Sequence, residues 1–100
     1  MAFTYSRKQT LDGAATTGPD YQVPLASFAV TAGRWYFLWV EGGNGFAHAA
    51  PAITDSDANT WTQINSLLFA GSNKRFTAYR MKPASGNAAL VVTIDYAVSI

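Results

Sequence analysis

Apolar and polar residues alternate along most of this chain with the two-residue period of β-strands. Residues 3–9 place Phe3 and Tyr5 on one side, and residues 21–30 alternate until their phase shifts near Phe28. Further strands are predicted at residues 35–41, 52–54, 60–64, 76–81 and 89–96. Helical periodicity is almost absent, and residues 63–70, the best helix candidate, are expected to form no more than a turn.

Turn-forming residues separate the predicted strands. They cluster at residues 31–34, 55–59, 71–74 and 83–87. Parallel strands would need crossover connections, usually helices, and the pattern contains none. The chain is therefore predicted to be an all-β, antiparallel β-sandwich of about seven or eight strands, either jelly-roll or immunoglobulin-like.

The segment at residues 35–41 is apolar on both sides, which predicts a central strand covered on both faces. Trp35, Phe37 and Trp39 share one side of it, and we expect them to fill the core. Pro24 interrupts residues 21–30 and predicts an edge strand or a bulge there.

The length of 100 residues fits one domain. We expect residues 1–20 to form an N-terminal arm or strand and loop, and residues 21–100 to form the β-sandwich. Only 13% of residues are charged, against 49% hydrophobic. Such a surface is either kept soluble by Thr, Ser, Asn and Gln or partly covered by other chains.

Charge and cysteine content exclude several classes of function. The net charge is +1 and no basic run exceeds two residues, so nucleic-acid binding is not expected. The chain has no cysteine, which excludes disulfides and thiolate chemistry. No signal-peptide pattern opens the chain, and its longest apolar run, residues 35–40, is too short for a membrane span. We expect synthesis in a cytoplasm and no membrane association.

Three segments together resemble a β-sandwich module common in bacteriophage virion proteins. They read ITDSDANTWT at residues 53–62, FTAYR at residues 76–80 and VVTI at residues 91–94. The resemblance covers roughly residues 28–96. Ala58 stands where the module usually has glycine, so the left-handed backbone position is expected to move to Asn59.

The resemblance implies a structural virion protein, first a capsid decoration or cementing protein that binds the major capsid protein or other virion subunits. A carbohydrate- or receptor-binding module of a tail or fibre is one alternative, and a tail or neck component is another. The resemblance also implies location in the virion and a homo-oligomer, with a trimer favoured. It implies neither an enzyme nor a cofactor.

Two candidate binding sites accompany these hypotheses. The first strand could act as an arm that adds to the sheet edge of a neighbouring subunit. Its candidate contact residues are Phe3, Tyr5, Arg7 and Lys8. For the sugar-binding alternative, the candidate ligand platform is Trp61 with Tyr36.

Asp55, Asp57 and Asn59 alternate as in the first half of a calcium loop. Ser66 stands where the bidentate Glu of such a loop belongs, so a hairpin turn capped by these side chains is the favoured interpretation. His48 is the one histidine, and no nucleophile-elbow motif accompanies it. The sequence predicts no catalytic, cofactor-binding or metal-binding residues.

Overall fold

The computed structural model describes residues 21–43, 50–69, 71 and 74–96 of the chain. These residues form eight strands and no helix. The strands are β1 (Tyr21–Pro24), β2 (Phe28–Val30), β3 (Tyr36–Gly43), β4 (Ala52–Asp55), β5 (Thr62–Phe69), β6 (Lys74–Met81), β7 (Asn87–Leu90) and β8 (Val92–Tyr96).

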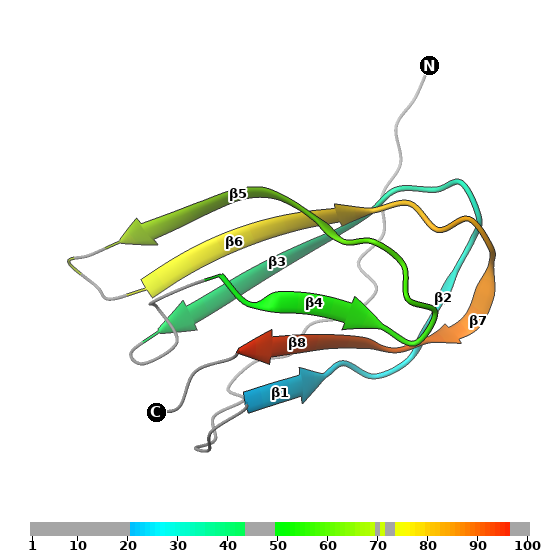
Figure 1. Cartoon of the computed structure of the whole chain (residues 1–100), viewed down its shortest axis with the longest axis horizontal. Helices are drawn as coiled ribbons and strands as arrows, with labels where there is room; N and C mark the ends of the chain where they lie inside the picture. Colours follow the sequence, from blue (N-terminus) through cyan, green and yellow to red (C-terminus); the bar gives the residue numbers. More distant parts are fainter. Residues whose placement is uncertain (1–20, 44–49, 70, 72–73, 97–100) are drawn as a thin grey trace.

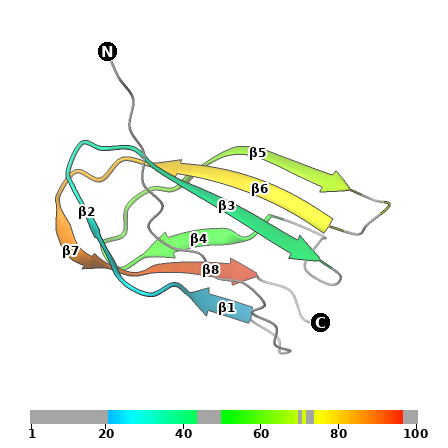
Figure 2. The same cartoon turned by 180° about the vertical axis from the view of Figure 1, so that it is seen from behind.

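The strands pack as two facing layers (Figure 1). One layer is the sheet β3-β6-β5, the other is β1-β8-β4, and the short pair β2-β7 joins the layers at one end. The view from behind shows the same separation (Figure 2). Every described strand pair is antiparallel, so the predicted all-β antiparallel sandwich is confirmed.

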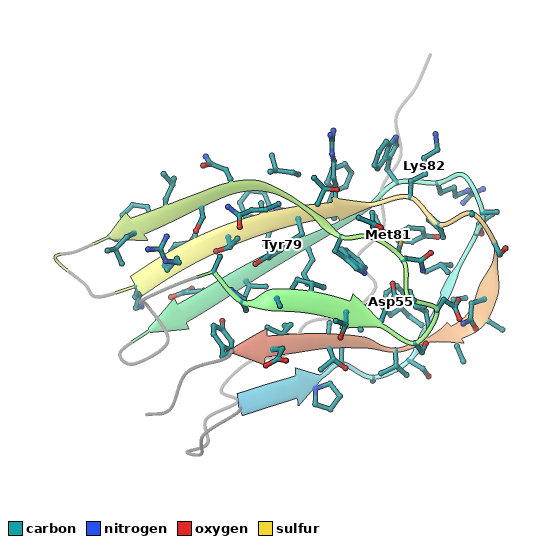
Figure 3. The ribbon with its side chains drawn as sticks, viewed as in Figure 1. Asp55, Tyr79, Met81 and Lys82 are labelled. Atoms are coloured by element: carbon teal, nitrogen blue, oxygen red, sulfur yellow. The ribbon has the colours of Figure 1, made fainter. Side chains whose placement is uncertain are left out.

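The core lies between the layers because each strand turns alternate side chains inward. Val40 and Tyr79 meet Ile94 and Tyr96 from the opposite sheet. A second group is formed by Val30, Met81, Leu90 and Val92. Tyr79 and Met81 can be followed in Figure 3, where they project from β6 toward the second layer.

Two predictions for residues 21–34 are confirmed: the irregularity within residues 21–30 and the turn at residues 31–34. The predicted phase shift near Phe28 separates β1 from β2. Pro24 ends β1, an edge strand of its sheet, where a missing N–H costs no ladder bond. Residues 31–34 form a turn in which Arg34 N–H donates to the carbonyl of Thr31 and Gly33 has a φ of 77°.

Three predictions about strands are wrong. Residues 63–69 do not form a turn, because β5 runs from Thr62 to Phe69 beside β6. The run at residues 89–96 is two strands, β7 and β8, which join different sheets on either side of Val91. The prediction that residues 35–41 form a central strand is also wrong, because among the described strands β3 lies at an edge of its sheet and β6 at the centre.

The left-handed turn position is also corrected. Ala58, and not Asn59, takes the positive φ, at 55°. The hydrogen bonds of the turn explain this, since Asp55 holds both the backbone and the side chain of Asn59.

Candidate docking face

The exposed side of β3 carries a row of aromatic side chains. Trp35, just before the strand, is 51% exposed, Phe37 is 62% exposed and Trp39 is 77% exposed. The alternate residues Leu38 and Val40 point inward and contact the core. The expectation that these three aromatics fill the core is therefore wrong: they lie on the outside of the sandwich.

Strands β5 and β6 carry further exposed apolar side chains on the same side of the sheet. Phe76 pairs with Glu41 on one side and with Leu67 on the other, so the three residues form one transverse row. Phe69 lies edge-on to Phe76 with ring centroids 5.5 Å apart. Leu67, Phe69 and Phe76 are 52%, 48% and 37% exposed.

We call the six residues Trp35, Phe37, Trp39, Leu67, Phe69 and Phe76 the outer apolar face. Fully exposed aromatic side chains present about 150–250 Å² each. At the exposed fractions above, the six together leave roughly 600 Å² of apolar surface in water. The largest apolar patch on a typical monomer is about 300–600 Å², so this face is at the upper limit for a surface without a partner.

Charged residues border the face unevenly. The Trp35 ring has the Arg80 guanidinium and the Lys82 ammonium each 5.4 Å from its centroid, and Arg34 is exposed beside it. Lys82 lies on the side of β6 away from the core (Figure 3). At the other end Lys74 pairs with Glu41 at 3.1 Å. One end of the face is thus cationic and the other is neutral.

The two residues of the predicted ligand platform, Trp61 and Tyr36, are both half-buried. Trp61 is half-buried and packs against the core, and its indole Nε1–H donates to Oδ2 of Asp55 at 2.8 Å. Tyr36 packs against the other core group, and its hydroxyl accepts from the backbone N–H of Thr31. Both side chains are engaged in holding the fold, and neither belongs to the outer apolar face.

The Asp55 carboxylate organises the turn at residues 55–59. Its Oδ1 accepts from the backbone N–H groups of Asp57 and Asn59, at 2.9 and 3.0 Å. Its Oδ2 accepts from the Asn59 side chain and from Trp61. Figure 3 shows Asp55 at the end of β4. Four donors on one carboxylate account for the alternating Asp and Asn residues as a capped turn, as the sequence favoured.

A shallow polar depression lies beside this turn, lined partly by Asp57, Ser85 and Asn87. Asn87 Nδ2 donates to Oδ2 of Asp57 at 2.8 Å, which links the turn to β7. In the part of the chain that the structure describes, no three His, Cys, Asp or Glu residues group as metal ligands would. No helix of that part is both long and apolar enough to span a membrane.

Tyr79 is a buried titratable group between the layers. The Tyr79 hydroxyl donates to the carbonyl oxygen of Pro51. Burial raises the pKa of Tyr79 above its ordinary value of 10.0, and a hydrogen bond with Thr77 opposes that rise. The group is positioned to stabilise the fold and does not reach the outer apolar face.

The proposed arm residues Phe3, Tyr5, Arg7 and Lys8 and the single histidine, His48, lie outside the described residues. The division into residues 1–20 and 21–100 therefore stays a prediction. Comparisons with protein-family models, with curated proteins and with solved structures found no match to this chain.

Proposed function

We propose that this chain is a structural protein that docks onto protein partners through the outer apolar face. The observation that carries the proposal is the exposure of Trp35, Phe37 and Trp39 in one row, with Trp39 at 77%. Aromatic side chains dominate the energetics of protein interfaces, and so many on one sheet face carry a large cost in water. The low share of charged residues, 13%, agrees with a surface that partners cover.

Within that class we propose a virion protein, and first a capsid decoration or cementing protein. The resemblance of residues 53–62, 76–80 and 91–94 to phage virion modules supports this assignment. A tail or neck position would place the same domain beside a different neighbour. In each case the domain contributes apolar area between larger subunits.

The test uses particles assembled from the genome that encodes this chain. Mass spectrometry of purified particles should detect the chain, and particles made without it should bind the added protein. A Trp39→Glu variant should bind at least about tenfold more weakly, because it places a charge in the centre of the contact. The virion assignment would be contradicted if purified particles contain none of the chain and particles made without it do not bind the added protein.

The exposed aromatic row also favours a second candidate, a carbohydrate-binding module. Trp35 and Trp39 could stack on sugar rings, which the half-buried Trp61 cannot do as freely. Sugar sites also need polar groups that fix the hydroxyls, whereas Leu67, Phe69 and Phe76 supply only apolar contact. Glycan-array binding that disappears in Trp39→Ala, with the fold unchanged, would favour this candidate over protein docking.

A further inference from the structure

The two sheets of the sandwich differ in how their outer sides are built. The exposed positions of β4 are Ala52 and Thr54, which are small, whereas the outer side of β3-β6-β5 carries the outer apolar face. Sheets bury an apolar face by stacking on another apolar layer about 10 Å away. Among the described residues no such layer covers this side.

We propose that the outer apolar face packs against the same face of a second copy of the chain, which gives a twofold pair of sandwiches. The inference rests on the proposed docking role of this face and names a second copy of the chain as the partner that covers it. A particle would then bind the pair through its other surfaces, and Trp39→Glu would weaken that binding because single copies lose the avidity of the pair. A surface that meets its own copy forms an isologous contact, and such contacts have twofold symmetry. The resemblance alone favoured a threefold assembly.

The area of the face matches what such a pair needs. A stable interface buries about 800 Å² on each partner. The outer apolar face supplies roughly 600 Å² of that, and Lys82, Lys74 and Glu41 at its border supply a polar rim. An apolar centre with a polar rim is the ordinary composition of a protein interface.

The strand register fixes which residues would meet. Trp39, Ala78 and Asn65 form the middle row of the sheet. The row containing Phe37, Arg80 and Thr62 lies on one side of it, and the row containing Glu41, Phe76 and Leu67 lies on the other. A twofold axis that runs along the middle row, across the strands, therefore brings the two Trp39 side chains together.

Charge selects one of the two possible orientations. An axis parallel to the strands would place Arg80 opposite Arg80 and Lys82 opposite Lys82, which repel. An axis across the strands reverses the second copy, so that Arg80 faces the row of Glu41 and Phe76. Lys82 then faces Lys74, whose charge is paired with Glu41, and the cationic ends lie at opposite ends of the pair. We assign the second orientation, since like charges in contact destabilise an interface.

Sedimentation equilibrium over a range of concentrations tests the pair. The wild-type chain should approach twice its monomer mass, and Trp39→Glu should weaken association at least about a hundredfold. The matched control is Thr54→Glu, which adds the same charge to the outer side of the other sheet and should associate as the wild type does. Circular dichroism verifies that each variant is folded.

A distance measurement tests the orientation. The chain has no cysteine, so Lys82→Cys carries one nitroxide spin label per copy. Lys82 lies four residues beyond Ala78 along the chain, which at 3.3 Å per residue separates the two labels by about 26 Å in the assigned orientation. With the axis parallel to the strands the separation falls below about 15 Å.

Three results overturn the inference: a monomer at all concentrations, a trimer, or a dimer that Thr54→Glu disrupts and Trp39→Glu does not. A short label distance in a dimer that Trp39→Glu disrupts overturns the assigned orientation. A monomeric chain that still binds virion particles through Trp39 overturns the twofold pair and leaves the proposed function standing. A chain that forms the twofold pair but is incorporated into no particle overturns the proposed function and leaves the twofold pair standing.

Discussion

At the scale of single residues, Ala58 shows how a turn can impose an unfavourable backbone conformation. Its φ of 55° lies in the left-handed region, which costs a residue with a Cβ roughly 1 kcal/mol relative to glycine. We predict that Ala58→Gly raises the free energy of unfolding by about 1 kcal/mol in urea titrations. Ala88→Gly, in the exposed middle of β7, is the control and should lower it. An unchanged or lower stability for Ala58→Gly would contradict this account of the turn.

Asp55 is the residue on which that turn depends most. Its carboxylate accepts four hydrogen bonds, one of them from Trp61 in the core layer. We predict that Asp55→Ala lowers the free energy of unfolding by about 2–4 kcal/mol, because several donors lose their partner at once. Asp57→Ala removes one exposed bond to Asn87 and should cost less than about 1 kcal/mol. Equal losses in the two variants would show that the carboxylate of Asp55 has no special role.

The buried hydroxyl of Tyr79 is expected to lower the free energy of unfolding at alkaline pH. Burial, only partly offset by Thr77, raises its folded-state pKa above 10.0, so the folded chain holds the phenol proton more tightly than the unfolded chain does. This contribution is complete below pH 10 and is lost as the pH rises through the folded-state pKa. Unfolding free energies measured across that range should fall more steeply for the wild type than for Tyr79→Phe. Parallel pH profiles would contradict the assignment.

At the scale of elements, β3 is a strand with two apolar sides and only one buried side. Val40 faces the core and Trp39 faces away from it. We predict that Val40→Ala lowers the free energy of unfolding by about 1.5–3 kcal/mol, whereas Trp39→Ala costs less than about 1 kcal/mol in dilute solution. Chemical denaturation of both variants at low protein concentration measures this. A larger loss for Trp39→Ala would mean that the indole is part of the fold.

Local patterns predicted the turns better than the strand partners. The phase shift near Phe28 and the turn at residues 55–59 follow from short-range chemistry, and both are confirmed. The strand predicted at residues 60–64 contains only the start of β5, and the rest of β5 was missed because Asn65 and Ser66 have low strand propensity. Pairing with β6 overrides that preference, and a bulge between Gln63 and Asn65 accommodates it.

The outer apolar face was missed for a related reason. A strand that is apolar on both sides is normally central, and nothing in residues 35–41 says which side stays exposed. The signals that could have revealed it were the low charged content and a second apolar row, Leu67 and Phe69, at the same two-residue spacing. Together these indicate more apolar surface than one core between two sheets can bury.

At the scale of the whole molecule, the sandwich is asymmetric. The core between the sheets is closed by Tyr79, Ile94 and their neighbours, while a second apolar surface remains outside β3-β6-β5. Such a molecule reaches its lowest free energy in water only when that surface is covered. The account therefore predicts assembly, with a copy of itself as the partner on this face.

The most direct measurement follows the three tryptophans as fluorotryptophan signals in ¹⁹F NMR while the concentration is raised. Single Trp→Phe variants assign the three signals. The account predicts that the Trp35 and Trp39 signals shift as the outer apolar face is covered, while the Trp61 signal, already fixed by Asp55, stays constant. Concentration-independent signals for Trp35 and Trp39 would contradict it.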